Sequence, residues 1–227
     1  MITSHHNPLL KDVRRLASRR ERGRFVAEGE DLLEAAADAG WNPVHLLRAG
    51  VEVSEDALAK VSTLGSGTRA LAVFDERWAE RPTGPLVVAL WGVKDPGNVG
   101  TVLRGALAFG ASCVALGPDT ADPYGPKAVR ASMGAIFHVP VARVASVDQL
   151  PGTTIALDAR RGEPLRGPAQ EPVSVVVGAE RAGLPPAVVE SCDRAAHIPI
   201  ASESLNAAMA ATLAVYELTR VTTPEAP

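Results

Sequence analysis

Short apolar runs recur along the second part of the chain. They are rich in valine, leucine, isoleucine and alanine, which is typical of strands buried on both faces of a parallel sheet. They predict strands at residues 86–91, 113–116, 154–157, 173–177 and 196–200. Helical periodicity predicts helices at residues 98–109, 125–133, 185–191 and 204–220. Strands that alternate with helices in this order predict an α/β domain with a mostly parallel sheet.

A smaller α/β unit is predicted at the start of the chain. Apolar runs predict strands at residues 24–27, 43–47 and 69–74, and amphipathic segments predict helices at residues 28–39 and 55–61, the second capped by Ser54. Residues 76–85 combine charges with Pro82 and Pro85 and have no apolar period, so they read as an exposed linker. We therefore expect domains over residues 1–75 and 86–221.

Composition narrows the class of protein. The two cysteines, Cys113 and Cys192, lie far apart and form no CxxC pair, so we expect neither a disulfide framework nor a metal site. The chain shows neither the apolar core of a signal peptide nor a membrane-spanning run. These features favour a soluble, cytoplasmic protein.

The net charge of -3 does not favour nucleic-acid binding, but the charge is unevenly distributed. Between residues 11 and 24, only Asp12 and Glu21 oppose the basic side chains. Those basic residues are Lys11, Arg14, Arg15, Arg19, Arg20, Arg22 and Arg24. The run is suited to an RNA backbone, although a solvated helical face explains it equally well.

Three loops share a strand–loop–helix form. In the first, residues 93–101 follow a strand and begin a helix, so free amides and the Asn98 side chain can hold an anionic or carbonyl oxygen, with Arg104 about two turns further. In the second, residues 175–185 place Glu180 just after a strand. The third runs from Ile198 to Asn206 and leads into an alanine-rich helix. Each loop alone has a structural explanation, with Ser204 as a helix cap.

The apolar stripe of the last helix also has a structural explanation. Leu205, Met209, Leu213 and Tyr216 recur at helical spacing, which is expected of a face that packs in the core.

Taken together and in this order, the loops resemble the SpoU (TrmH) branch of the SPOUT methyltransferases. The resemblance covers residues 86–220 and rests on Asp95, Pro96, Gly97, Asn98, Gly100 and Arg104, then Gly178, Glu180, Gly183 and Leu184, then Ile198, Pro199, Ser204, Leu205 and Asn206. Residues 127–135 resemble the family's Arg-x-Ser-x-Gly segment. Residues 24–30 and the basic helix before them resemble the L30e-like substrate-binding domain of many members.

The resemblance implies an activity and a cofactor. The expected reaction transfers a methyl group from S-adenosylmethionine to the 2′-hydroxyl of an RNA ribose, in 23S ribosomal RNA rather than transfer RNA. The cofactor would lie bent in a C-terminal trefoil knot, whereas ordinary topology rules predict an unknotted doubly wound sheet. The residues expected to line its pocket are Leu157, Gly178, Ile198, Ser204 and Leu205.

The resemblance also assigns residue roles. Arg104 is the proposed catalytic residue, assisted by Asn98, Glu180, Ser204 and Asn206. Because a guanidinium stays protonated in proteins, we expect Arg104 to stabilise a developing alkoxide and the adjacent phosphate rather than act as a base. RNA contacts are expected from Arg14, Arg15, Arg19, Arg20, Arg22, Arg24, Lys127 and Arg130.

A homodimer is expected as well, because the family forms dimers and the last helix is suited to close packing. The alanines that would permit this packing are Ala207, Ala208, Ala210, Ala211 and Ala214.

Other functions remain open at this point. A non-catalytic RNA-binding protein of ribosome assembly would need only the basic run, but it would not need the polar residues of all three loops. A nucleotide-dependent metabolic enzyme would fit the mild acidity. Against it, Gly97, Gly100 and Gly105 do not form a GxGxxG fingerprint, and no GxxxxGK[ST] loop is present.

Overall fold

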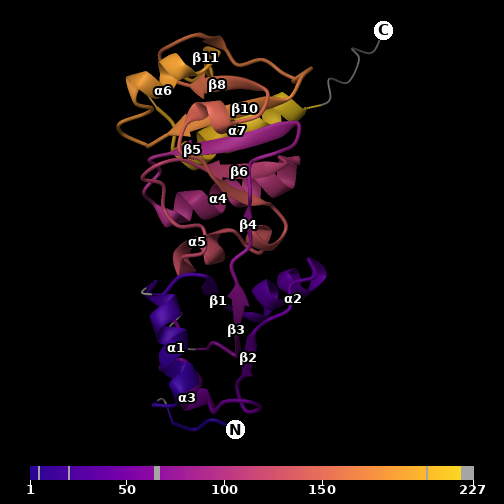
Figure 1. The fold of residues 1–227 in the computed structure, drawn as a ribbon, viewed down its shortest axis with the longest axis vertical. Coiled ribbons are helices and arrows are strands. Elements are labelled where there is room, and N and C mark those ends of the chain that lie inside the picture. Colours follow the sequence, from indigo (N-terminus) through magenta and orange to yellow (C-terminus); the bar gives the residue numbers. More distant parts are fainter. Residues whose placement is uncertain (5, 20, 64–66, 203, 221–227) are drawn as a thin grey trace.

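The computed structural model describes residues 1–4, 6–19, 21–63, 67–202 and 204–220, and these form two sheets (Figure 1). The smaller sheet is antiparallel, with the strand order β1-β3-β2. Its strands are β1 (Arg24–Glu28), β2 (His45–Arg48) and β3 (Ala70–Asp75). Helices α1 (Pro8–Ala17), α2 (Glu30–Asp38) and α3 (Glu55–Ala59) accompany it.

The larger sheet has the strand order β4-β7-β6-β5-β10-β8-β11-β9. Its strands are β4 (Trp78–Ala79), β5 (Leu86–Trp91), β6 (Cys113–Leu116), β7 (Val141–Arg143), β8 (Thr153–Leu157), β9 (Glu163–Pro164), β10 (Val173–Gly178) and β11 (Arg194–His197). Every strand pair in the described part of this sheet is parallel. The α/β fold class with a mostly parallel sheet is confirmed.

Helices cover both faces of the large sheet. Alternate residues of β5 face opposite ways, so Leu90 joins the core beneath α4 (Pro96–Phe109) and α7 (Ala207–Thr219), whereas Ala89 joins the core beneath α6 (Pro186–Ser191). The short helices α5 (Pro126–Ala131), η1 (Ala135–Phe137) and η2 (Val147–Gln149) complete this domain. No described helix is long and apolar enough to cross a membrane.

The two sheets share one hydrophobic core, which was not expected from the sequence. Phe25 and Phe74 of the small sheet contact Phe137 of the large domain, with ring centroids 5.9 and 5.2 Å apart. The Trp41 Nε1 donates a hydrogen bond of 2.8 Å to the carbonyl oxygen of Phe137. The small sheet is therefore packed directly against the large domain.

The predicted linker is mostly exposed, but part of it pairs with the large sheet. Within residues 76–85, β4 pairs with β7 at the edge of the large sheet, and the Trp78 side chain is partly buried. Glu76 accepts hydrogen bonds from Arg19 and Trp78. Local composition signalled exposure, but the partners of these residues come from distant parts of the chain.

The last strand and the last helix also differ from the prediction. We expected a strand at residues 196–200, but β11 ends at His197, because Pro199 cannot donate a ladder hydrogen bond. The last helix begins at Ala207, and its cap is Asn206 rather than Ser204. Four of its alanines are buried within the chain (Ala207, Ala208, Ala211 and Ala214), so they do not form the expected dimer face.

Candidate active site at the strand ends

The site lies where the parallel strands of the large sheet end. β10 is in register with both neighbours, so Gly178 lies beside Trp91 of β5, and Val177 lies beside Leu157 of β8. Because parallel strands end at one edge, the loops that follow β5, β8 and β10 meet there. The three sequence motifs are thereby brought together.

A chain of hydrogen bonds joins three of the predicted catalytic residues. Asn206 Nδ2 donates to Asn98 Oδ1 at 3.1 Å, and Asn98 Nδ2 donates to Glu180 Oε1. These residues come from the start of α7, the first turn of α4 and the loop after β10. We call this chain the Asn206–Asn98–Glu180 network.

The helix cap of α7 fixes the direction of this network. Asn206 Oδ1 accepts hydrogen bonds from the backbone N–H groups of Ala208 (2.9 Å) and Met209 (3.2 Å). Its amide nitrogen must therefore face Asn98, which in turn must present its own amide nitrogen to the Glu180 carboxylate. The cap thus determines which atoms meet in the site.

The start of α4 is held by a cap and an ion pair. Asp95 Oδ1 accepts a hydrogen bond of 2.8 Å from the Gly97 N–H, and Lys127 Nζ lies 2.7 Å from the same oxygen. The Lys127 ammonium and the Gly97 amide together hold the pKa of Asp95 below its usual range. Lys127 therefore stabilises the loop that carries Asn98.

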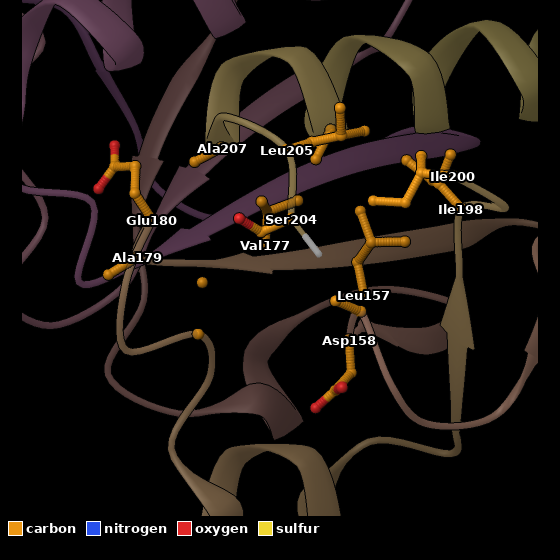
Figure 2. Close-up of a pocket in the computed structure, with 14 residues that line it drawn as sticks. Leu157, Asp158, Val177, Ala179, Glu180, Ile198, Ile200, Ser204, Leu205 and Ala207 are labelled. Atoms are coloured by element: carbon orange, nitrogen blue, oxygen red, sulfur yellow. The ribbon is translucent and has the colours of Figure 1, made fainter. Parts of the chain in front are cut away.

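A pocket opens beside the network (Figure 2). It is lined by all five predicted cofactor residues: Leu157, Gly178, Ile198, Ser204 and Leu205. Ile198, Ile200 and Leu205 lie together on one side, and Glu180 lies at the opposite end (Figure 2). The pocket therefore combines an apolar side with a polar end.

Sequence analysis missed one charged residue of this pocket. Asp158 follows β8 directly and lines the pocket, and its Oδ1 accepts a hydrogen bond of 2.8 Å from the backbone N–H of Arg160. Its position after a predicted parallel strand was the available signal, the same signal that singled out Glu180.

The loop after β10 is a tight turn that permits no side chain at Gly178. The Gly183 N–H donates to the Ala179 carbonyl at 2.9 Å, and Gly183 has a φ of +66°. A Cβ atom at Gly178 would lie 2.3 Å from the Gly183 carbonyl carbon and 2.4 Å from the Leu184 nitrogen. Glycine at position 178 is thus required by close packing of the backbone.

Arg104 lies outside this constellation within the chain. It is exposed on α4, does not line the pocket, and has no hydrogen-bond or ion-pair partner among the described residues. Leu107, one turn further on the same helix face, is also exposed. The structure therefore places Glu180 and Ser204 in the wall of the pocket, with Asn98 and Asn206 joined to Glu180 by hydrogen bonds, whereas Arg104 lies apart on the exposed surface of α4.

The predicted RNA-binding arginines are mostly paired with carboxylates. Arg15 pairs with Asp12 and Glu21, Arg22 with Asp122, and Arg24 with Asp75. The Arg19 side chain is only 12% exposed and pairs with Glu76 and Asp122 at 2.6 Å each. Arg19 thus connects the segment after α1 to Glu76 and to Asp122, which are remote in sequence.

The remaining predicted RNA contacts differ in their surroundings. Arg14 has no ion-pair partner in the described ranges, and Arg130 donates a hydrogen bond of 3.1 Å to Thr63 Oγ1. Arg20 lies outside the described residues. No group of three or more potential metal ligands occurs among the residues the structure describes.

Comparison with known proteins identifies relatives along most of the chain. The sequence model described as the SpoU rRNA Methylase family matches residues 85–216. The chain is 32% identical over 243 residues to the 23S rRNA (guanosine(2553)-2′-O)-methyltransferase RlmP of Bacillus subtilis strain 168, and the alignment covers 96% of this chain and 98% of RlmP.

Solved structures agree with these sequence matches. The crystal structure of an AdoMet-bound rRNA methyltransferase from Sinorhizobium meliloti superposes with a TM-score of 0.86 at 31% identity, covering 96% of both chains. The SpoU methyltransferase AviRb from Streptomyces viridochromogenes, solved with the cofactor AdoMet, gives a TM-score of 0.81 at 26% identity, covering 94% of this chain and 97% of AviRb.

Proposed function

Because the chain belongs to the SpoU rRNA Methylase family, we propose that it transfers a methyl group from S-adenosylmethionine to a ribose 2′-hydroxyl of 23S ribosomal RNA. The observation that carries the proposal is the Asn206–Asn98–Glu180 network at the edge of the pocket. The relatives named as 23S rRNA 2′-O-methyltransferases favour ribosomal RNA over transfer RNA. Action on ribosomal RNA also favours a cytoplasmic location.

The pocket fits S-adenosylmethionine in its chemistry. Ile198, Ile200 and Leu205 offer an apolar surface to an adenosine, and Asp158 and Glu180 offer negative charge to a sulfonium and an ammonium group. If only neutral groups lined the pocket, the sulfonium and the ammonium would lose their water on binding without gaining a charged partner. The mixture of an apolar side with two carboxylates therefore suits this cofactor.

The reaction needs positioning more than strong acid or base chemistry. S-adenosylmethionine supplies a methyl group that is already activated by the sulfonium. Glu180 Oε1 is held by Asn98, and its other oxygen has no hydrogen-bond partner among the described residues, so it accepts a hydrogen bond from the ribose 2′-hydroxyl. This contact orients the attacking oxygen, which contributes to the rate through proximity.

Arg104 stabilises the negative charge that develops on the 2′-oxygen and on the neighbouring phosphate. Its guanidinium has no carboxylate partner in the described part of the chain, so its full charge is available to the RNA. It remains protonated throughout and does not accept the proton, which passes from the 2′-hydroxyl to the free oxygen of the Glu180 carboxylate as the carbon–oxygen bond forms and the carbon–sulfur bond breaks. Arg104→Ala is expected to lower kcat by about 100-fold or more, as for loss of a transition-state contact.

The test of this role separates chemistry from binding. Methyl transfer is followed with labelled cofactor on an unmodified 23S rRNA transcript, and cofactor affinity is measured by calorimetry. Affinity should stay within about twofold of the wild-type value, because Arg104 does not line the pocket. Turnover that is unchanged in Arg104→Ala would remove this residue from the mechanism.

The same transcript tests the reaction class itself. A 2′-O-methyl group protects the adjacent phosphodiester from alkaline hydrolysis, so the modified nucleotide appears as a gap in a hydrolysis ladder. Labelled RNA with no such gap would mean that the methyl group goes to a base. Methylation of transfer RNA but not of 23S rRNA would assign the alternative substrate.

The active form is a homodimer that uses an exposed apolar face on α4 and α7. Met209, Leu213 and Tyr216 are 56%, 41% and 48% exposed, although their stripe reads as core in the sequence. The Tyr216 ring contacts that of Phe109 on α4 at 5.5 Å, so the two helices form one surface. An exposed cluster of large apolar side chains of this kind marks an interaction site.

A double variant tests the dimer. Leu213→Lys with Tyr216→Lys is expected to halve the mass measured by light scattering, because two buried cations would oppose association. Val51→Lys, at an apolar residue that is 57% exposed in the N-terminal domain, is the matched control and should leave the dimer intact. A wild-type protein that is monomeric at micromolar concentration would contradict the proposal.

The C-terminal strands are threaded as a trefoil knot. Support comes from the strand order, since β10 lies between β5 and β8 although it follows both in sequence, and β11 returns to the far side of β8.

The N-terminal domain serves as the RNA-binding module, with Arg14 and Arg130 as the predicted contacts that have no carboxylate partner in the described ranges.

A further inference from the structure

A second hollow lies beside the cofactor pocket and shares a wall with it. Six residues line both spaces: Leu157, Asp158, Ala159, Glu180, Gly183 and Ser204. Arg160 and Arg181 line the second hollow but not the cofactor pocket. We call this second space the outer hollow.

The two spaces differ in charge: two carboxylates line the cofactor pocket, whereas the outer hollow is lined by the same two carboxylates and by two guanidinium groups. Both carboxylates, Asp158 and Glu180, stand on the shared wall, where they face a cationic cofactor. Each already has one oxygen engaged, Glu180 with the Asn98 amide and Asp158 with the Arg160 N–H. The two guanidinium groups are found only on the outer side. The carboxylates suit a cation in the cofactor pocket, and the guanidinium groups that are added in the outer hollow suit an anion beside it.

Both arginines are free to bind an anion. Arg160 and Arg181 are exposed, and neither side chain has a hydrogen-bond or ion-pair partner among the residues the structure describes. The N-terminal arginines differ, because Arg15, Arg22 and Arg24 already pair with carboxylates. An unpaired guanidinium keeps its whole donor set for bidentate contact with an oxyanion.

The chemistry of the substrate identifies the anion. The amino-acid end of the cofactor carries both an ammonium and a carboxylate, so its net charge is zero. RNA brings one negative phosphodiester for each nucleotide, and the ribose carbon adjacent to the one that bears the 2′-hydroxyl carries the 3′-phosphate. A ribose placed against Glu180 therefore brings its backbone to the same edge of the sheet.

We infer that the outer hollow is a phosphate subsite, in which Arg160 and Arg181 bind the RNA backbone that flanks the target ribose. This inference rests on the proposed function, because it takes the substrate of the neighbouring site to be RNA. It adds two RNA contacts that the N-terminal basic run does not supply.

The test measures RNA affinity and cofactor affinity separately in the full-length protein. Binding of the unmodified 23S rRNA transcript is followed by filter binding across a range of salt concentrations, for Arg160→Gln, Arg181→Gln and the double variant. Arg194→Gln is the matched control. Arg194 is exposed, has no described partner, and lies at the start of β11, whereas the outer hollow lies where the parallel strands end.

Each single variant in the outer hollow should weaken RNA binding about tenfold, which is the value of one charged hydrogen bond. The slope of log affinity against log salt should fall by about 0.7 to 0.9 for each lost phosphate contact. S-adenosylmethionine affinity by calorimetry should stay within about twofold, and Arg194→Gln should bind RNA like the wild type.

Two results would overturn the inference. The double variant could bind the transcript with wild-type affinity and salt slope, which would leave the outer hollow without a phosphate. Cofactor affinity could fall while RNA affinity is retained, which would assign the arginines to the cofactor carboxylate. Failure of the proposed function would instead appear as wild-type protein that binds the transcript and leaves every ribose unmodified.

Discussion

Asn206 has two tasks at the scale of single residues. Its side-chain oxygen caps α7, and its amide nitrogen sets the direction of the Asn206–Asn98–Glu180 network. Stability and activity therefore depend on different atoms of one side chain. Such a separation allows a substitution that removes one role and keeps the other.

Asn206→Asp is expected to keep the cap and lose the network. Aspartate caps helices as well as asparagine does, so the free energy of unfolding should change by less than about 0.5 kcal/mol. The new carboxylate cannot donate to Asn98 Oδ1, so kcat should fall about tenfold or more. Asn206→Ala should lose both activity and about 1 kcal/mol of stability.

Thermal unfolding and single-turnover methyl transfer on the same preparations separate these effects. An Asn206→Asp protein that is fully active would show that the donor to Asn98 is not needed. Equal losses of stability in the aspartate and alanine variants would show that the cap explains everything.

Sequence motifs predicted the polar residues of the site better than their surroundings. Asn98, Glu180 and Asn206 stand at fixed places in three strand–loop–helix units, so their convergence followed from a parallel sheet. Asp158 and Arg160 belong to a loop with no such motif and were missed. The carboxylate partners of Arg19 are Glu76 and Asp122, which are remote in sequence, so its burial could not be predicted.

At the scale of elements, two glycines of α4 allow this helix to pack closely against two different helices, α5 and α7. A Cβ atom at Gly100 would lie 2.3 Å from the Ala128 carbonyl oxygen of α5, and one at Gly105 would lie 2.5 Å from Thr212 Oγ1 of α7. The first obstacle is backbone, whereas the second is a side chain. The position of α4 matters because its first turn carries Asn98.

Gly100→Ala should destabilise the protein more than Gly105→Ala does. Alanine favours a helix over glycine by about 1 kcal/mol at both positions. At Gly100, however, α4 and α5 must separate, at a cost of about 1 to 3 kcal/mol, while Thr212 can move at lower cost. Denaturant unfolding measures the difference, and kcat should fall only in Gly100→Ala. A more stable, fully active Gly100→Ala protein would contradict this packing argument.

Elements with a strong apolar period were predicted well, and short or proline-limited ones were not. The strands at residues 86–91 and 113–116 are confirmed at both ends. β4, β7 and β9 were missed because two or three residues give no recognisable period. The face of α7 was assigned wrongly, since small alanines fill the core while Met209, Leu213 and Tyr216 remain exposed.

At the scale of the whole molecule, Glu76 connects the two domains. Burial alone would raise the pKa of Glu76, but hydrogen bonds from Arg19 and Trp78 outweigh it, so that the pKa lies below its usual range. A carboxyl group with a depressed pKa in the folded state stabilises the protein above its unfolded pKa. That contribution disappears as the pH falls through the folded value.

Glu76→Gln should therefore be less stable than the wild type at pH 7 and nearly equal to it in acid. The loss at pH 7 is expected to be about 1 to 3 kcal/mol, as for hydrogen bonds to a charged group. The difference should narrow below the ordinary glutamate pKa of about 4.3. Thermal unfolding of both proteins at a series of pH values checks this. A stability difference that does not change with pH would show that the charge of Glu76 is not its cause.

The arrangement of the domains could not be predicted from the sequence. Residues 76–85 have the composition of a linker, and nothing local signals that Phe25 and Phe74 pack against Phe137. The aromatic residues that join the domains are far apart in sequence. Only their positions in three dimensions reveal that the two units have one core.

This common core holds the two sheets at a fixed distance from each other. The N-terminal domain cannot swing toward or away from the methyl-accepting position without exposing Phe25, Trp41 and Phe137 to water. The distance between the N-terminal sheet and the site at the ends of β5, β8 and β10 is then fixed. An RNA that contacts both regions at once must therefore present its target ribose at that spacing.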